Sequence, residues 1–190
     1  MQQNEKLIIV SAPSGSGKTT LIKHLMSQLP MFEFSISATT RPMREGETDG
    51  KDYYFLTVEK FKKLIEQQQF IEWEEVYEGR YYGTLKSEIT RIANKGKIAI
   101  FDVDVKGGIN IKKLYGSSAF SIFIQPPSIE VLEERLRIRA TDTEEDIRAR
   151  VNKAAEEMTY SSQFDQIVVN DNIEVSKTKL VDIVKEFLGK

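Results

Sequence analysis

The chain has 190 residues, a length that fits one domain with insertions and can bury a substantial interior. Its formal net charge is −2, so no general positive field attracts nucleic acid or a membrane surface, and we expect neither as a partner. Cysteine is absent and His24 is the single histidine, which excludes disulfides, thiolate nucleophiles and zinc sites built from these residues. The first residues lack a basic region and the apolar runs are too short to cross a bilayer, so we expect a soluble, cytoplasmic protein.

The first predicted elements are a strand, a loop and a helix. Residues 6–11 form a short run rich in β-branched residues and leucine, typical of a strand buried on both faces. After a loop, apolar residues recur at helical spacing from Leu21 to Leu29, and Pro30 ends the segment. A buried strand, a loop and a helix are the beginning of a βαβ unit.

Strands and helices alternate along the rest of the chain. The predicted strands are 34–38, 53–56, 70–76, 97–103, 119–124 and 166–169. The predicted helices are 58–68, 86–95 with Gly96 as C-cap, 105–114, two charged helices after the N-caps Ser128 and Thr143, and about 175–188. This alternation predicts an α/β fold with a doubly wound, mostly parallel sheet. The closely spaced strands of 53–76 indicate a small mixed sheet inserted into that core.

The loop after the first strand reads APSGSGKTT, residues 12–20, and matches the phosphate-loop pattern except that Ala12 replaces the first glycine. Gly15 and Gly17 let backbone N–H groups turn toward phosphate oxygens, and the following helix adds its dipole. In such a loop Lys18 reaches the β- and γ-phosphates, and the Thr19 hydroxyl ligates Mg²⁺. The sequence therefore predicts an ATP site, and the alternative is a glycine-rich turn with a surface lysine.

Two acidic residues lie at the end of the predicted strand 97–103. Asp102 and Asp104 are two apart and share one face of the strand, and ligands bind at the carboxyl ends of strands in open α/β sheets. One carboxylate could support a hydrated Mg²⁺ and the other a bound nucleotide. Acids at strand ends are also ordinary turn formers, so the pair alone leaves both interpretations open.

Arginines on the two charged helices are candidates for covering a transferred phosphoryl group. Arg135 and Arg139 are i, i+4 neighbours, and Arg150 flanks an apolar stripe on the next helix. Surface arginines are usually solvated and paired with glutamates such as Glu134. Transfer between two nucleotides, however, needs mobile positive charge that covers the transferred group and excludes water.

A second pair of arginines, Arg41 and Arg44, lies outside the phosphate loop in the stretch TTRPMREGETDGKDYYF, residues 39–55. Two arginines at this spacing can bind the phosphate of a second substrate bidentately. Tyr53 and Tyr82 would add phenolic donors.

The stretch FIEWEE supplies a further candidate, Glu72, whose carboxylate would lie in a base pocket if the residue is buried. The simpler interpretation makes Glu72 a solvated strand residue and Trp73 a core residue.

Together these stretches resemble the guanylate kinase family over nearly the whole chain. The matching sequences are SAPSGSGKTT, SISATTRPMREGE, GKDYYF, FIEW, YYGT, FDVD, RLRIRATDTEED and IVVND. The resemblance implies reversible transfer of the γ-phosphoryl group of ATP to GMP with Mg²⁺, with dGMP as a further acceptor, in purine nucleotide metabolism and GMP recycling. It also implies a phosphate-loop kinase fold with three parts: a core ATP-binding domain of residues 1–33, 97–127 and 160–190, an inserted GMP-binding domain of 34–96, and a mobile helical lid of 128–159.

The resemblance also assigns residues to each nucleotide. The ATP residues are Ala12, Pro13, Ser14, Gly15, Ser16, Gly17, Lys18, Thr19, Thr20 and, beside the adenine, Asn170. The GMP phosphate contacts fall on Arg41, Arg44, Tyr53 and Tyr82, and the guanine contacts on Ser37, Glu72, Thr84 and Asp104. Thr19 and Asp102 match residues near the metal, Asp102 through water and also near GMP, and the catalytic charges are Lys18, Arg135, Arg139 and Arg150.

The chain departs from the family pattern at two positions. Ala12 replaces the first glycine of the phosphate loop, and Ala140, after Arg139, stands where some relatives have glycine. The first is harmless if the φ angle of Ala12 is negative, and the second would alter lid flexibility slightly.

Three other functions are alternatives to this one. A guanylate-kinase-like interaction module of a scaffold protein would lack an intact phosphate loop, whereas Lys18 and Thr19 are both present. A GTPase would need a guanine-reading motif such as NKxD, which the chain does not contain. A kinase for a different monophosphate stays open until acceptors are compared. The expected partners are the small molecules ATP and GMP, and a homo-oligomer is compatible with the sequence.

Overall fold

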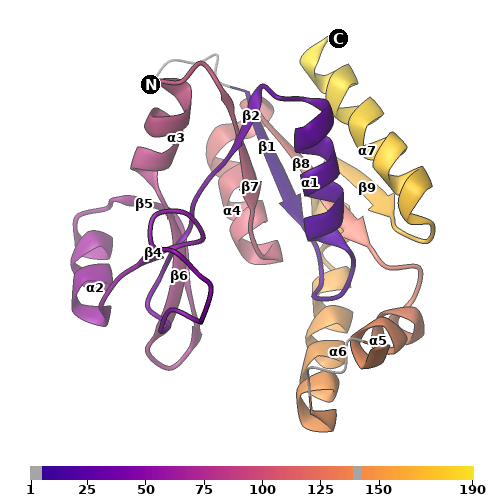
Figure 1. Cartoon of the computed structure of the whole chain (residues 1–190), viewed down its shortest axis with the longest axis horizontal. Helices are drawn as coiled ribbons and strands as arrows, with labels where there is room; N and C mark the ends of the chain where they lie inside the picture. The colour runs from indigo at the N-terminus through magenta and orange to yellow at the C-terminus, as the bar shows by residue number, and fades with distance from the viewer. Residues whose placement is uncertain (1–5, 139–142) are drawn as a thin grey trace. The chain divides into compact units, whose positions relative to one another are not determined.

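The protein is represented by a computed structural model that describes residues 6–138 and 143–190. The chain divides into two compact units (Figure 1). Unit 1 consists of Met1–Met31 and Phe101–Lys190, and unit 2 of Phe32–Ile100. A five-stranded sheet has the order β2 (Phe32–Phe34), β7 (Ile98–Asp102), β1 (Leu7–Ser11), β8 (Ala119–Gln125) and β9 (Gln166–Val169). A four-stranded sheet has the order β4 (Tyr54–Phe55), β3 (Ala38–Thr39), β6 (Arg80–Leu85) and β5 (Phe70–Tyr77).

Unit 1 contains the first strand, the phosphate loop and most of the helices. The β1 strand pairs in parallel with β8, and β8 pairs in parallel with β9. The strand order shows that the chain moves across the sheet in opposite directions after β1 and after β7. Because such crossovers are almost always right-handed, this order corresponds to the doubly wound sheet that was predicted. The elements are β1 (Leu7–Ser11), α1 (Lys18–Gln28), α4 (Val105–Tyr115), β8 (Ala119–Gln125), α5 (Ile129–Ile138), α6 (Glu144–Met158), β9 (Gln166–Val169) and α7 (Ile173–Leu188).

The core of unit 1 explains why its first strand is so apolar. Every residue of β1 is buried, as predicted for a strand covered on both faces. Helix α7 packs against α1, and α4 packs on β1 and β8. Burying this strand and the apolar faces of its helices holds the phosphate loop between β1 and α1 at a defined place.

Unit 2 contains the mixed sheet. Strand β3 pairs in parallel with β4 and antiparallel with β6, which pairs antiparallel with β5. Its small core is aromatic: Phe61 stacks on Phe70 with 4.3 Å between ring centroids and lies 5.3 Å from Tyr81. The elements are β2 (Phe32–Phe34), β3 (Ala38–Thr39), β4 (Tyr54–Phe55), α2 (Val58–Glu66), β5 (Phe70–Tyr77), β6 (Arg80–Leu85), α3 (Lys86–Ala93) and β7 (Ile98–Asp102), which runs past the unit boundary.

Two predictions about unit 2 were wrong, and one of its strands was not predicted. The predicted strand 34–38 is two strands, because the chain leaves the parallel sheet after Phe34, where β2 pairs with β7, and enters the mixed sheet at Ala38. Strand β6 was missed; its central Gly83 is a weak strand former, but a Cβ there would lie 2.8 Å from the Glu72 carbonyl oxygen. Trp73 was expected in the core and is 45% exposed on the edge strand β5.

The helix ends agree with the predictions in part. The hydroxyls of Ser128 and Thr143 accept hydrogen bonds from the N–H groups of Val131 and Asp146, as expected of N-caps. The C-cap of α3 is Asn94 and not Gly96, which follows it with a φ of 65°. Helix α2 ends two residues before residue 68, and α7 begins at Ile173, two residues earlier than expected.

None of the helices in the described part of the chain has the length and apolar character needed to span a membrane.

Candidate functional site

The phosphate loop connects a buried strand to a helix that begins with an open end. Gly15 and Gly17 have φ angles of 95° and 86°, which residues with a side chain rarely adopt. Gly17 is the N-cap of α1, and it provides no side-chain hydrogen bond to the first turn. The first N–H groups of α1 are therefore available to an anion, which the helix dipole also favours. Ala12 is buried and is not among the described residues with positive φ, so this departure costs nothing.

The side chain of Asn170 is hydrogen-bonded to the backbone of the phosphate loop. Its side-chain Nδ2 donates to the Ser16 carbonyl oxygen at 2.8 Å, and the residue is almost completely buried. A Cβ on Gly17 would lie 2.5 Å from the same Nδ2 atom. Asn170 was assigned to the adenine by resemblance; in the structure its side chain touches the phosphate loop, so its visible contact is with the loop backbone.

Lys18 is held at the carboxyl end of β7. Its Nζ lies 2.6 Å from Asp102 Oδ1 and donates to the Val103 carbonyl oxygen at 3.1 Å. The structure therefore brings together two residues that the sequence had placed in different motifs. Both side chains are partly exposed, so the ammonium group can reach a solvent-borne phosphate.

The hydroxyl-bearing residues of the loop and Asp102 fit a magnesium–nucleotide complex. Thr19 and Thr20 are exposed in the first turn of α1. No group of three or more acidic or histidine residues that could hold a metal by itself occurs among residues 6–138 and 143–190. Mg²⁺ usually keeps several waters and binds through one or two carboxylates and substrate phosphates, so this donor set is adequate.

Asp104 has a local role in addition to the one assigned to it. Its Oδ1 accepts from the Gly107 N–H at 2.6 Å, so it is the N-cap of α4, and its carbonyl oxygen accepts from the Ser11 hydroxyl at 3.0 Å. Asp104 therefore has the local structural role that the alternative interpretation of an acid at a strand end predicts.

Glu157 on α6 was missed because it is one of several glutamates on a charged helix, a pattern that carries no specific signal. Burial raises its pKa, the Lys153 ammonium group opposes this, and the charge of Asp104 raises it further. The Glu157 side chain is only 13% exposed, and the positive charge of Lys18 lowers its pKa, as that of Lys153 does. The structure thus adds a carboxylate to the environment of Lys18 and Asp104.

Two of the three proposed lid arginines lie within the described residues. Arg150 Nη1 donates to the Ser14 hydroxyl of the phosphate loop at 2.9 Å. Arg135 Nη1 donates to the Asn170 carbonyl oxygen at 3.0 Å, just after β9. Arg139 and Ala140 lie outside the described residues.

In unit 2, Arg41 is enclosed by a carboxylate and two aromatic rings. Its guanidinium donates to both oxygens of Glu47, at 2.7 and 2.5 Å, and to the Pro42 carbonyl oxygen. It lies 4.9 Å from the ring centroid of Tyr53 and 5.5 Å from that of Phe55. Arg41 is only 8% exposed, so its orientation is set by these neighbours.

Glu47 is a functional candidate that the sequence analysis missed, although it lies three residues after Arg44 in the motif. Hydrogen bonds from the Arg41 side chain and the Arg44 N–H lower the pKa of Glu47 to about 2. The hydrogen bond to Glu47 in turn raises the pKa of Arg41. The backbone N–H of Arg44 donates to Glu47 Oε2 at 2.8 Å, and Arg44 itself is exposed. We call Arg41, Arg44, Glu47, Tyr53 and Tyr82 the acceptor cluster; the last two rings make an edge contact at 6.2 Å.

Glu72 and Thr84 face each other across β5 and β6. They are register partners, and the Thr84 hydroxyl donates to Glu72 Oε1 at 2.7 Å. Thr84 is fully buried and Glu72 is half-buried. The carbonyl oxygen of Ser37 accepts from the Tyr54 N–H at 2.9 Å, which joins the third assigned base contact to β4. Unit 2 thus presents a carboxylate oriented by a buried hydroxyl.

Comparisons with known proteins agree with one another. A family model described as guanylate kinase matches residues 4–187. A guanylate kinase of Bacteroides thetaiotaomicron is 53% identical, covering 100% of this chain and 93% of that protein, and one of Porphyromonas gingivalis is 49% identical, covering 97% and 99%. Among solved structures, guanylate kinase from Anaplasma phagocytophilum has a TM-score of 0.73 and 29% identity, covering 96% of this chain and 86% of that one.

Proposed function

The chain belongs to the guanylate kinase family, and from this premise we propose that it transfers the γ-phosphoryl group of ATP to GMP, giving ADP and GDP. The observation that carries the proposal is that one chain holds an intact phosphate loop with Lys18 and, in unit 2, an arginine cluster with a hydroxyl-oriented carboxylate. A scaffold module would need only a binding surface, whereas these groups are those that phosphoryl transfer requires.

ATP binds at the phosphate loop in this proposal. Backbone N–H groups of the loop and of the first turn of α1 donate hydrogen bonds to the phosphate oxygens, and Lys18 leaves Asp102 to neutralise charge on the β- and γ-oxygens. Arg135, Arg139 and Arg150 belong to a lid of residues 128–159 that closes over the transferred group. The hydrogen bond from Arg150 to Ser14 supports this role, because it already joins a lid residue to the phosphate loop.

Mg²⁺ bound with ATP would be held by the Thr19 hydroxyl and, through water, by Asp102. When bound, the ion neutralises charge between the β- and γ-phosphates and orients them. The exposure of Thr19 and the position of Asp102 beside Lys18 support this placement.

GMP binds through the acceptor cluster and the base residues. Its phosphate competes with Glu47 for Arg41 and also engages Arg44, Tyr53 and Tyr82. Guanine has adjacent N1–H and 2-amino donors, and Glu72 can accept both while Thr84 holds the carboxylate in place. By the family resemblance, Ser37 and Asp104 are the other residues proposed to contact the base. The proposal assigns no residue to the 2′-hydroxyl of the ribose, so we expect dGMP to be a further acceptor.

The test is a coupled ADP-release assay with ATP, Mg²⁺ and one of GMP, dGMP, AMP, CMP or UMP. GMP should be used with a kcat/KM at least ~10⁴-fold above that of AMP, because bound AMP would cover the half-buried Glu72 carboxylate without offering it either donor. A stronger response to AMP, CMP or UMP would assign the chain another acceptor. Equal ADP release without any acceptor would indicate an ATPase, and no release at all would favour a binding module.

A further inference from the structure

A buried glutamate of unit 2 lies outside the residues assigned to either nucleotide. Glu88 on α3 is 1% exposed. A buried carboxylate is costly unless both oxygens have hydrogen-bond partners. Its Oε2 accepts from the Ile36 N–H at 2.6 Å and Arg91 Nη2 at 2.8 Å, and its Oε1 accepts from the Tyr54 hydroxyl at 2.7 Å and Arg91 Nε at 2.8 Å.

These partners converge on the segment that crosses between the two sheets. Residues 35–37 belong to neither β2 nor β3, so they lack a continuous strand ladder. Glu88 binds the N–H of Ile36, and Arg91 Nη2 donates to the Phe34 carbonyl oxygen at 2.9 Å. On the other side, the Ser37 carbonyl oxygen accepts from the Tyr54 N–H. The Glu88–Arg91 pair therefore fastens both the crossing segment and the strand beside it.

Both fastened points adjoin residues that we assign to GMP. Ile36 precedes Ser37, and Tyr54 follows Tyr53, whose ring lies under Arg41. We propose that Glu88, together with Arg91, is a positioning residue for the acceptor site, which holds Ser37 and Tyr53 where GMP meets them without reorganisation of the backbone. This inference rests on the proposed function. Preorganised contacts retain binding free energy that would otherwise be spent on ordering the chain.

The protonation states suit this role. Burial alone would raise the pKa of Glu88, but hydrogen bonds from Arg91, the Ile36 N–H and Tyr54 together lower it, so Glu88 is an anion at neutral pH. Burial and the hydrogen bond to Glu88 raise the pKa of Tyr54 to about 12, so its hydroxyl keeps the proton that it donates. The network thus keeps one charge arrangement over the working pH range.

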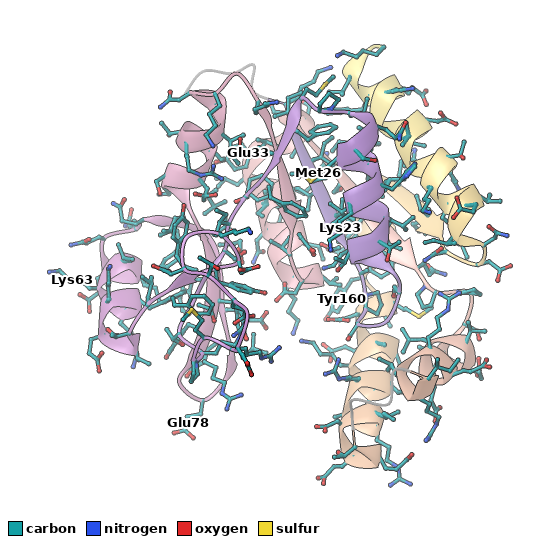
Figure 2. The ribbon with its side chains drawn as sticks, viewed as in Figure 1. Lys23, Met26, Glu33, Lys63, Glu78 and Tyr160 are labelled. Carbon is teal, nitrogen blue, oxygen red and sulfur yellow. The ribbon has the colours of Figure 1, made fainter. Side chains whose placement is uncertain are left out.

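The first test is Glu88→Gln, which keeps the shape but replaces one acceptor oxygen by an NH₂ group facing other donors. We expect the KM for GMP to rise roughly ten-fold, because small misplacements of binding groups are costly, while kcat and the KM for ATP stay within about two-fold. Glu33→Gln is the matched control: Glu33, labelled in Figure 2, also pairs with Arg91 and with Lys95, whereas the hydrogen bonds to Ile36 and Tyr54 are made by Glu88. It should leave the KM for GMP unchanged.

A merely structural role would give a different result. A Glu88→Gln protein that melts at a lower temperature but keeps the wild-type KM for GMP would overturn the proposal, as would equal increases in both KM values. If that variant does not fold, Tyr54→Phe decides, since it removes one hydroxyl only: a GMP-specific rise in KM supports the proposal and no change refutes it. Where both fold, the double variant should show less than the sum of the two effects. Failure of the wild-type chain to phosphorylate GMP would instead refute the proposed function.

Discussion

The phosphate loop of unit 1 and the acceptor cluster of unit 2 are both proposed to bind phosphate, but they are built differently. The loop uses backbone N–H groups, and its shape follows from two glycines and from the burial of β1 and Asn170. The acceptor cluster uses side chains, and its buried arginine, Arg41, is held by the side chain of Glu47. The base residue Glu72 is likewise held by the side chain of Thr84. Backbone sites tolerate few substitutions at the glycines, whereas side-chain sites depend on the partner of each contact.

The largest expected effect is on the donor side. Lys18→Ala should lower kcat by at least ~10²–10³, because it removes a charge that stabilises the transferring group. Its effect on stability should be small, since the side chain is partly exposed and its Asp102 partner is too. Steady-state kinetics with a thermal melt measures both quantities. Lys23→Ala, an exposed lysine on the same helix, is the control and should keep wild-type turnover; near-normal turnover of well-folded Lys18→Ala would refute the assignment.

On the acceptor side, Glu72→Gln should lower kcat/KM for GMP by at least about ten-fold, because an NH₂ group would face one of the guanine donors. The use of AMP should fall less or rise. Parallel assays with the two nucleotides decide this, with Glu75→Gln, an exposed residue of the same strand, as control. Equal losses for GMP and AMP would mean that Glu72 supports the strand, and base selection would pass to Ser37, Thr84 and Asp104.

Gly17→Ala tests whether backbone shape limits the donor site. The new Cβ would lie 2.5 Å from Asn170 Nδ2 at a φ of 86°, so we expect a loss of ATP affinity and of roughly 1–3 kcal/mol of stability from strain. Gly79→Ala is the matched control, because its φ is 69° and nothing lies within 4 Å of the added Cβ. Denaturant unfolding and ATP titration measure both variants, and equal effects in the two would remove Asn170 from the explanation.

The smallest effect concerns pH. The pKa of Glu47 is lowered to about 2 from an ordinary 4.5, so its ion pair stabilises the fold above pH 4.5 and is lost as the pH falls toward 2. In Arg41→Ala the pKa of Glu47 should rise toward 4.5, and in the wild type GMP should raise it too, because the phosphate takes Arg41. Carboxyl-carbon NMR titration measures this shift. Lys51→Ala should not change the pKa of Glu47. If the pKa of Glu47 were the same in Arg41→Ala as in the wild type, the ion pair with Arg41 would not be its cause.

The same contrast explains what could be predicted from the sequence. The phosphate loop was placed correctly between β1 and α1 because its function depends on local backbone and on residues adjacent in the chain. The pairing of Lys18 with Asp102 was not foreseen, since it joins two motifs through tertiary contact. Glu47 and Glu157 were missed because a glutamate in a polar stretch gives no signal until its neighbours in space are known.

The fold shows similar limits. The alternation of strands and helices predicted the parallel sheet, and the closely spaced strands of 53–76 predicted the mixed sheet; both sheets are present. The run 34–38 was read as one strand because local propensity does not reveal that the chain changes sheets within it. Likewise, aromatic character placed Trp73 in the core, although it lies on the edge strand β5 and is exposed. Tertiary context decided each of these features.

The central claim is that each nucleotide has its own set of residues, and calorimetry on Arg44→Ala tests it most directly. GMP and ATP would be titrated separately into the wild type and the variant, with Lys51→Ala as a control for loss of a positive charge from the same loop. Loss of a charge-assisted hydrogen bond costs about 1.5–3 kcal/mol, so GMP affinity should fall about 10- to 150-fold while ATP affinity stays unchanged. An equal loss of affinity for both nucleotides would contradict the account, because Arg44 would then serve both.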